Sequence, residues 1–585
     1  MSVTQKVHSK LDAFSSTAIA GNDILSSCLY VCGIAILFAG VWAPLVFILI
    51  GLVLFLYKYV YTEVVEALPL NGGAYNCLLN ATSKPLAAVA GVMTTLSYVA
   101  TSVISAKTAA AYLQTVWTWL PVIPATAAII IFFAILVILG VKDSAKVAKI
   151  IFGLHIFTLG LFVSIGLLQL FNDGLGHIVQ SLAQTSANFA DKGALPLLFF
   201  AFSASLLGVS GFESSANFVE EQDQGVFRQT LKYMLAGVVF FNPLITLVVL
   251  RNLDLHTIEQ VKDFVLSDAA LQVGGLGLKY LVVADAFLVL SGAVLASFVG
   301  ASGLLYRMTL DHCFPSKLLL PKLKQRNRNN TRIIIAFALL CLSILAATKG
   351  VLLSLAGVYT ISFLGVMTLF AVGNLILRMT RPELKRPFKS PIIFTVIAAL
   401  STIAGIVGNV IIDPQNLVFF LIYFLPTLAV VLSMIFRDYI LESLLNMSKS
   451  WPWLYNLILP SFNHVVRPRI LLFAHHPRKL YSAIEYIRKN ETSRNITIIF
   501  CQNDNHSAKD FTHEFKQFVQ FFTEAQIFPN LDLTLEIEKD LIFGPDTIKA
   551  YANRYKTTRN NIFIGSIHDR HNFNFEDLGG VRIIQ

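Results

Sequence analysis

The stretch AIAGNDILSSCLYVCGIAILF, residues 18–38, decides the fold that we predict for this chain. It is apolar enough to enter a lipid bilayer and long enough to cross one as a helix. Its first two thirds nevertheless carry four polar residues that helical spacing gathers on one broad face: Asp23, Ser26, Ser27 and Tyr30. A carboxylate in a membrane span is costly unless it meets water, a cation or a partner. We therefore predict that this face lines a substrate path; the alternative is that Asp23 lies among the lipid headgroups.

The composition of the whole chain indicates a polytopic membrane protein. Of its 585 residues, 55% are hydrophobic and 14% are charged, whereas soluble proteins carry about 25% charged residues. The net charge of +10 lies mainly in short loops, so we expect no nucleic-acid partner. The six cysteines form no CxxC pair, and neither a disulfide framework nor a metal site is indicated. We predict no cofactor and no enzymatic activity.

The apolar runs predict about twelve membrane helices. They lie near residues 18–39, 42–65, 86–115, 124–141, 147–170, 194–217, 231–251, 277–305, 332–348, 351–378, 391–412 and 415–436. Loops dense in Lys and Arg alternate with loops that are poor in them; the dense loops are Lys142–Lys149, Arg228–Lys232, Lys317–Arg332 and Arg378–Lys389. The positive-inside rule then places both chain ends in the cytoplasm, including the polar residues 1–17. Residues 1–17 show no signal-peptide pattern, so we expect the first span to direct the chain to the cell membrane.

The C-terminal part of the chain changes in composition. Residues 437–466 read as an interfacial linker, because Trp451, Trp453 and Tyr455 suit a headgroup boundary. Residues 467–585 alternate short apolar runs with helical patterns; the apolar runs are Arg469–His475, Asn495–Phe500 and Asn561–Gly565. Such alternation predicts a small cytoplasmic α/β domain.

Two further spans carry polar patterns. In the third span, Ser97, Thr101 and Ser105 form one stripe at four-residue spacing, which can bind a cation or substrate or can join helices. In the sixth span, the sequence FFAFSASLLGVSGFESSANFVEEQ (199–222) places glycines and polar residues in mid-membrane. This pattern is typical of a discontinuous transporter helix, and a simple kink is the alternative. Gly357 and Gly365 similarly predict a bend in the tenth span.

Ionisable residues within spans are the remaining candidates. His155 in the fifth span titrates near neutral pH and is a candidate proton carrier, or else a histidine hydrogen-bonded between helices. Glu213 is either an acid on the transport path or a cap of the broken helix. We expect Lys107 to extend toward the membrane surface and Asp285 to lie near the outer end of its span.

Four motifs in the correct order resemble those of amino acid–polyamine–organocation (APC) permeases over about residues 15–436. They are LPLNGGAY (68–75), GVKDSAKVAK (140–149), GFESSANFVEEQ (211–222) and GASGLLYRMTLDHCFP (300–315). The resemblance implies a twelve-helix domain over 18–436 with the LeuT-like fold, two inverted five-helix repeats followed by two extra helices. The domain over 467–585 resembles universal-stress-protein domains, which implies a regulatory or dimerising role.

The resemblance is incomplete in the first span. APC amino acid permeases carry a Gly-x-Gly break where this chain reads SSCLYVCG (26–33). The sequence NDILSSCLY (22–30) is instead similar to the first span of bacterial potassium importers of the same superfamily, and the residues that match their ion-binding set are Asp23, Tyr30, Thr101, Ser105 and Ser210. Ser97 replaces the third-span acid of those importers. His155 falls where some proton-coupled permeases carry a lysine.

These features predict a secondary active transporter that imports an amino acid with a proton, by alternating access around discontinuous helices one and six. The expected substrate-binding residues are Asp23, Ser26, Ser27, Tyr30, Ser97, Thr101, Ser105, Ser210, Gly211 and Phe212, with Phe212 as an aromatic lid. His155 and Glu213 are the expected proton-coupling residues. The expected partners are a small-molecule substrate, a proton, the lipid bilayer and a second copy bound through the C-terminal domain. The alternatives are a potassium importer and a nutrient sensor that signals through the soluble tail.

Overall fold

The computed structural model describes residues 10–140, 145–223, 225–318, 331–382, 384, 386–501, 511–538, 543–565 and 581–584. Most of the predicted basic loop Lys317–Arg332 lies outside the described residues, as do residues 142–144 of the predicted basic loop Lys142–Lys149 and residues 141–144 of the motif at 140–149. The chain divides into two compact units. The first comprises Met1–Thr82, Leu86–Thr309 and Ser316–Leu428, and the second comprises Ser83–Pro85, Leu310–Pro315 and Ala429–Gln585.

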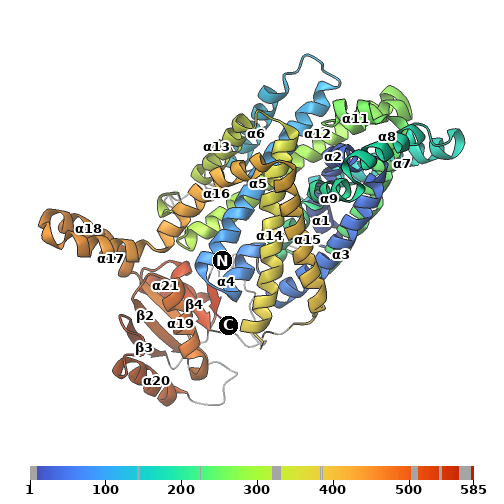
Figure 1. Ribbon diagram of the computed structural model, residues 1–585. Helices are drawn as coiled ribbons and strands as arrows, with labels where there is room; N and C mark the ends of the chain where they lie inside the picture. The colour runs from blue at the N-terminus through green and yellow to red at the C-terminus, as the bar shows by residue number, and fades with distance from the viewer. Residues whose placement is uncertain are drawn as a thin grey trace, which may run out of the picture. The chain divides into compact units, whose positions relative to one another are not determined.

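The first unit is built from helices (Figure 1). The α-helices up to the sixth predicted span are α1 (Ala13–Ser26), α2 (Cys28–Ala39), α3 (Ala43–Ala67), α4 (Gly73–Ala81), α5 (Lys84–Gln114), α6 (Val122–Ile138), α7 (Ala145–Asp173), α8 (Ile178–Lys192) and α9 (Ala194–Ser205). Those that follow are α10 (Val226–Asn252), α11 (Leu255–Val261), α12 (Val265–Leu310), α13 (Thr331–Ala347), α14 (Leu352–Thr380), α15 (Ile392–Ile412) and α16 (Pro414–Ile435). Short 3-10 helices are η1 (Gly40–Trp42), η2 (Leu206–Val209), η3 (Phe212–Asn217), η4 (Val219–Glu221) and η5 (Ser316–Leu318).

The described helices agree with the predicted membrane spans. Nine described segments are long and apolar enough to cross a membrane, and one of them, Ala13–Ala67, covers the first two predicted spans. The shorter apolar helices α6 and α13 coincide with the fourth and ninth predicted spans. A helix therefore occupies each predicted span, and the chain is a mostly helical, multi-pass membrane protein.

Glycines act differently in α12 and α14. In α12 the dihedral angles are non-helical at Gly274 and Gly275, so the helix of the eighth predicted span begins after this break. The tenth span, for which a bend or an interruption was expected, is not interrupted, because α14 is one continuous helix. There the glycines give space for packing: a Cβ atom at Gly357 would overlap the side chain of Asn416 on α16. A glycine in a span thus permits either a break or a close helix approach.

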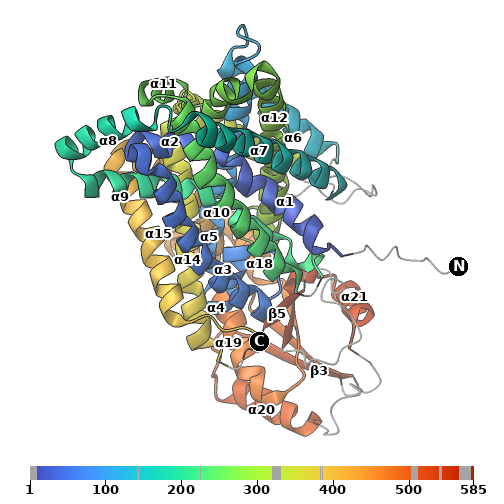
Figure 2. The same ribbon diagram turned by 90° about the vertical axis from the view of Figure 1, so that its right-hand side faces the viewer.

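Packing places the first span at the centre of the first unit. Helix α1 packs against α7 and α10, as Figure 2 shows, and eleven of its fourteen residues are buried. A separate apolar cluster joins α5, α6, α12 and α13, where the rings of Phe298 and Phe337 meet edge to face with their centroids 4.8 Å apart. These contacts hold the polar face of α1 inside the helical assembly.

The second unit contains a five-stranded parallel sheet with the strand order β3-β2-β1-β4-β5. Its elements are α17 (Arg437–Met447), η6 (Ser448–Ser450), α18 (Pro452–Val466), β1 (Arg469–Phe473), η7 (Pro477–Lys479), α19 (Leu480–Asn490), β2 (Asn495–Cys501), α20 (Thr512–Glu524), β3 (Asp532–Glu538), α21 (Pro545–Arg554), η8 (Arg559–Asn561), β4 (Ile562–Gly565) and β5 (Arg582–Ile584). Helices α19 and α20 cover one face of the sheet, and α21 covers the other. The predicted strands correspond to β1, β2 and β4, and the region predicted as a linker contains helices α17 and α18.

A buried ion-pair network stabilises the second unit. Glu491 pairs with Lys84, their Oε1 and Nζ atoms lying 3.2 Å apart, and also with Arg582. The Nε atom of Arg582 lies 3.1 Å from Oδ1 of Asp311, and the backbone N–H of Lys84 donates to Asn490 over 2.7 Å. The network therefore joins the three segments of this unit, although they lie far apart in the sequence.

We expect Glu491→Gln to destabilise the second unit by about 3–5 kcal/mol at pH 7, because it leaves buried cations without their counter-ion. Burial favours the neutral form of Glu491, but Arg582 and Lys84 outweigh it and hold the pKa of its carboxyl below the ordinary value of 4.5. The contribution of this carboxylate is thus present above pH 4.5 and is lost as the pH falls through the lowered pKa. The difference in the free energy of unfolding between the wild type and the Glu491→Gln variant should therefore become smaller as the pH falls.

Proteolysis of the full-length protein at increasing urea, at pH 7 and at pH 4, measures this effect. The matched control is Glu485→Gln, which removes only ion pairs within α19 and should cost less than about 1 kcal/mol. Equal protection of the Glu491 variant and the wild type at pH 7 would contradict the prediction.

Candidate substrate-binding site

The sixth span is interrupted in its middle. Helix α9 ends at Ser205 and continues as η2, after which Ser210 takes an extended ψ of 143° and Gly211 a left-handed φ of 90°. The 3-10 helix η3 then begins at Phe212. Only glycine adopts such a φ without strain, so Gly211 allows the chain to unwind here. The predicted discontinuity of the sixth span is confirmed.

The first span departs from its predicted break. Only Ser27 separates α1 from α2, and its dihedral angles remain helical, with φ −62° and ψ −27°. The backbone N–H of Ser27 bonds to the carbonyl of Ile24, which is one tightened turn and not an unwound segment. No glycine lies at this place, so the backbone has no residue that readily leaves the helical region. The expectation of a discontinuous first helix is therefore corrected to a tightened turn at Ser27.

The polar face of the first span meets the break of the sixth. The hydroxyl of Ser214 donates to Oδ2 of Asp23 over 2.6 Å, and the hydroxyl of Ser27 donates to the carbonyl of Gly208 over 3.1 Å. A Cβ atom added to Gly211 would lie 2.8 Å from Cγ of Asp23. Asp23 is only 9% exposed, so it faces the interior of the first unit.

Other predicted site residues are buried near this contact. The hydroxyl of Ser26 donates to the carbonyl of Asp23 over 2.8 Å, and Tyr30 is 1% exposed. Phe212 is fully buried and packs edge to face against Tyr61, with ring centroids 5.7 Å apart. Phe212 therefore packs against α3, and its role as a lid stays a prediction. One carboxylate oxygen of Glu213 is buried and has no hydrogen-bond partner among the described residues.

The polar stripe of the third span is buried but turns partly toward its own helix. Ser97, Thr101 and Ser105 are each at most 5% exposed, and the hydroxyl of Thr101 donates to the carbonyl of Ser97 over 2.9 Å. The hydrogen bond that links α5 to the sixth span comes from a neighbour of the stripe, since Asn217 donates to the hydroxyl of Tyr98 over 2.5 Å.

His155 and Asp285 form a buried pair. Nδ1 of His155 lies 2.7 Å from Oδ2 of Asp285, which links α7 to α12, and the side chains are 0% and 1% exposed. Nε2 of His155 and Oδ1 of Asp285 have no hydrogen-bond partner among the described residues. His155 holds Asp285 in the interior of the helical assembly, and the expectation that Asp285 lies near the outer end of its span stays a prediction.

Lys107 is 4% exposed and forms an ion pair with Asp263, which lies in the segment between α11 and α12. The expectation that Lys107 extends toward the membrane surface stays a prediction. A partner 156 positions away in the sequence satisfies its charge. Neither residue type nor helical spacing reveals such a distant partner.

Sequence reasoning missed several residues of the site. Ser214, Tyr98, Tyr61 and Asn217 were not predicted, although Ser214 follows Glu213 directly in a motif that we had singled out. Tyr61 and Tyr98 lie in long apolar helices, where an aromatic residue is ordinary core material. Only the three-dimensional contact with the sixth span distinguishes them.

We expect Gly211→Ala to abolish function at this site. The left-handed backbone would cost about 1–3 kcal/mol with a side chain present, and the added methyl group would press on Asp23. Uptake by reconstituted protein and the thermal melting temperature in detergent measure the two effects. Gly153→Ala is the control, because a Cβ atom there meets nothing within 4 Å. Wild-type uptake by the Gly211 variant would show that the break is not required.

Comparison with known proteins identifies the family to which this chain belongs. Residues 11–435 match the family described as amino acid permease, whose members are membrane transporters. This match covers more than half of the chain, and the chain belongs to the amino acid permease family of the APC superfamily. The predicted resemblance is confirmed.

Solved structures and curated proteins were also compared. Two similar structures are mutants of the manganese transporter from Eremococcus coleocola, one with a histidine replaced by alanine and one with a glutamate replaced by glutamine. The first has 12% sequence identity and a TM-score of 0.46, and the match covers 77% of this chain and 94% of that one. The second has 13% identity and a TM-score of 0.44, with the same coverage. No curated protein matches the chain significantly.

Proposed function

We propose that this chain is a secondary active transporter that imports an amino acid with a proton across the cell membrane. The observation that carries the proposal is the unwound sixth span at Ser210 and Gly211, which contacts the polar face of α1 through Asp23 and Ser214. Discontinuous helices of this kind offer free backbone groups to a small solute in the middle of the membrane. Rocking of the helices around this point would give access to each side in turn.

In the proposal each group of residues has a distinct role. Backbone groups around Ser210 and Gly211 bind the charged ends of the substrate, and Phe212 covers it. Hydroxyl groups from the first and third spans complete the pocket. The substrate-binding residues are those predicted from the sequence: Asp23, Ser26, Ser27, Tyr30, Ser97, Thr101, Ser105, Ser210, Gly211 and Phe212.

Proton coupling is proposed for the His155–Asp285 pair and for Glu213. Nδ1 of His155 lies 2.7 Å from a buried carboxylate oxygen, so a protonated imidazole would form an ion pair with Asp285. Loss of that proton leaves the aspartate unpaired in a dry environment, which favours a different packing of α7 against α12. The protonation state of the pair would thereby be linked to the conformation.

The finer architecture is part of the same proposal. We propose the LeuT-like arrangement of two inverted five-helix repeats and two extra helices over 18–436, with both chain ends in the cytoplasm. We further propose that 437–466 lies at the membrane interface and that 467–585 is a universal-stress-protein-like regulatory domain through which two copies associate. The parallel sheet with helices on both faces supports the α/β fold of this domain.

Uptake into proteoliposomes tests the proposal, with a panel of amino acids supplied in the presence and absence of an inward proton gradient. We expect uptake of at least one amino acid that the gradient stimulates. Uptake at the same rate with and without the gradient would contradict proton coupling. Binding of an amino acid without measurable transport would favour a nutrient sensor.

A potassium importer is the second candidate, and the acidic character of the site favours it. Asp23 and Tyr30 lie buried beside the broken sixth span, as a cation site there would require. Growth of a potassium-uptake-deficient host at low potassium is the test. Failure of the membrane-expressed chain to restore growth would exclude this function.

A further inference from the structure

Two acidic residues lie together at the contact between the first and sixth spans. Asp23 comes from α1 and Glu213 from η3, and Asp23 contacts the chain on either side of Glu213: Ser214 donates to its carboxylate, and a Cβ atom at Gly211 would lie 2.8 Å from its Cγ atom. Asp23 receives a hydrogen bond from Ser214, whereas Oε2 of Glu213 is buried with no hydrogen-bond partner among the described residues. Like charges in a dry environment are unfavourable unless a cation or a proton is supplied.

The described chain supplies no such positive charge. None of the described Lys, Arg and His residues forms an ion pair with Asp23 or Glu213, although they satisfy other buried acids of the first unit. Glu63 is paired by Arg378, and Asp285 by His155. The acids beside the broken helix thus differ from the other buried acids of this unit in lacking a counter-ion.

Tyrosines surround the two carboxylates. Tyr61 packs against Phe212 of η3, and its hydroxyl has no hydrogen-bond partner among the described residues. The hydroxyl of Tyr98 accepts a hydrogen bond from Asn217 of η3, and Tyr30 of the first span is 1% exposed. Buried phenol groups attract cations through their oxygen atoms and through their ring faces. Carboxylates within a group of tyrosines therefore suit the binding of a compact cation.

We propose that Asp23 and Glu213 form the subsite for a positively charged group and that the transported solute carries a net positive charge. This inference rests on the proposed function, because it assigns a charge to the substrate of the same site. Two sources share the chemistry: the ammonium group of a cationic amino acid or amine, and an alkali-metal ion. A neutral amino acid would bring as much negative as positive charge to the site.

Binding to the purified full-length chain tests the charge with pairs of ligands matched in shape. Lysine is compared with norleucine and arginine with citrulline, and putrescine and potassium chloride identify the source of the charge. We expect lysine, arginine or putrescine, or else potassium, to bind roughly ten- to hundredfold more tightly than norleucine and citrulline, the effect of a charge-assisted buried contact. Equal affinity for lysine and norleucine, without potassium binding, would overturn the proposal.

Variants then assign the effect to the two acids. Asp23→Asn and Glu213→Gln should each weaken cation binding by about tenfold or more, while the ligand-free protein melts at an equal or higher temperature, because an unpaired buried charge has been removed. Glu259→Gln, on the exposed face of α11, is the control. Cation binding of unchanged affinity in both variants would overturn the proposal. A purely structural role of the two acids would appear as a lower melting temperature with unchanged affinity.

The outcomes separate this inference from the proposed function. A chain that transports norleucine as readily as lysine remains an amino acid permease, and only the charge proposal fails. A chain that binds and moves none of these solutes overturns both. Potassium binding without amine binding keeps the cation subsite and replaces the amino acid by the ion.

Discussion

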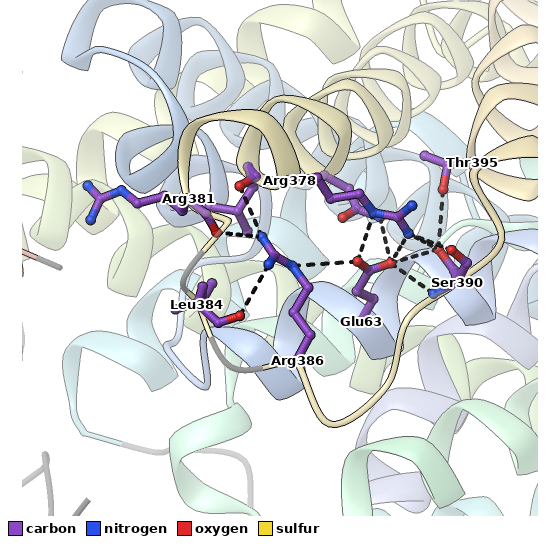
Figure 3. Close-up of polar contacts among 9 residues, drawn as sticks. Glu63, Arg378, Arg381, Leu384, Arg386, Ser390 and Thr395 are labelled. Atoms are coloured by element: carbon purple, nitrogen blue, oxygen red, sulfur yellow. Dashed lines mark hydrogen bonds and ion pairs between the residues drawn. The ribbon is translucent and has the colours of Figure 1, made fainter. Parts of the chain in front are cut away.

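The variant Glu63→Gln is expected to lower the stability of the first unit by about 3–5 kcal/mol, because it breaks a buried ion pair and leaves cations uncompensated. Glu63 is 1% exposed on α3 and accepts a hydrogen bond over 2.8 Å from Nε of Arg378 on α14. Ser390 donates to the same carboxylate through its backbone N–H over 3.0 Å and its hydroxyl over 2.8 Å. Figure 3 shows Glu63 between Arg378 and Arg386.

This carboxylate holds the segment that follows α14. Arg386 lies 3.7 Å from Glu63 and donates to the carbonyls of Arg381 and Leu384, over 2.9 Å and 3.2 Å. A glutamine would retain the shape of Glu63 but would present an N–H group where donors already converge. Loss of the charge thus weakens both the α3–α14 contact and the turn after α14.

Thermal melting of the reconstituted protein measures this effect, with Glu66→Gln as the matched control one turn further along α3. In a double-mutant cycle, Glu63→Gln combined with Arg378→Gln should be less destabilising than the sum of the two single changes, because the pair acts as a unit. Additive effects, or a melting temperature equal to that of the Glu66 variant, would contradict the role assigned to Glu63.

Local patterns were sufficient to predict the helical spans. Apolar runs of roughly 20 residues have few alternatives to a helix in a bilayer, so each predicted span contains a helix. Glycine was ambiguous because the same residue allows two structures. Gly211 breaks a helix, whereas Gly357 makes room for Asn416 in a continuous one. The neighbouring helix decides between them, and the sequence does not show which helix that is.

In the second unit, too, local sequence patterns predicted some elements, and contacts between distant residues were not predictable. Strands β1, β2 and β4 are continuous apolar runs buried within the sheet, so their sequences were sufficient. Strand β3 reads DLTLEIE and lies at the sheet edge, where polar residues alternate with apolar ones. Its weaker pattern was missed because an edge strand buries less surface. The ion pair between Glu491 and Lys84 joins residues 407 positions apart, beyond any local pattern.

Replacement of His155 by alanine is expected to abolish the stimulation of uptake by a proton gradient while solute exchange without a gradient persists. The physical reason is the pair with Asp285, whose two atoms lie 2.7 Å apart with no exposure to solvent. A proton on this pair decides whether α7 and α12 are joined by an ion pair. Without the imidazole the conformational change no longer requires a proton, so a proton gradient no longer increases uptake.

Stability must be separated from coupling in this experiment, since loss of a buried partner also costs about 3–5 kcal/mol. Thr158→Ala is the control, because Thr158 lies one turn further along α7 and its buried hydroxyl has no partner among the described residues. The double variant His155→Ala with Asp285→Ala removes both charges and should recover stability without recovering coupling. Gradient-stimulated uptake by the His155→Ala variant would contradict the role of the pair in proton coupling. If the double variant regains stability but its uptake is still not stimulated by the gradient, the pair couples the proton and does not merely hold the helices together.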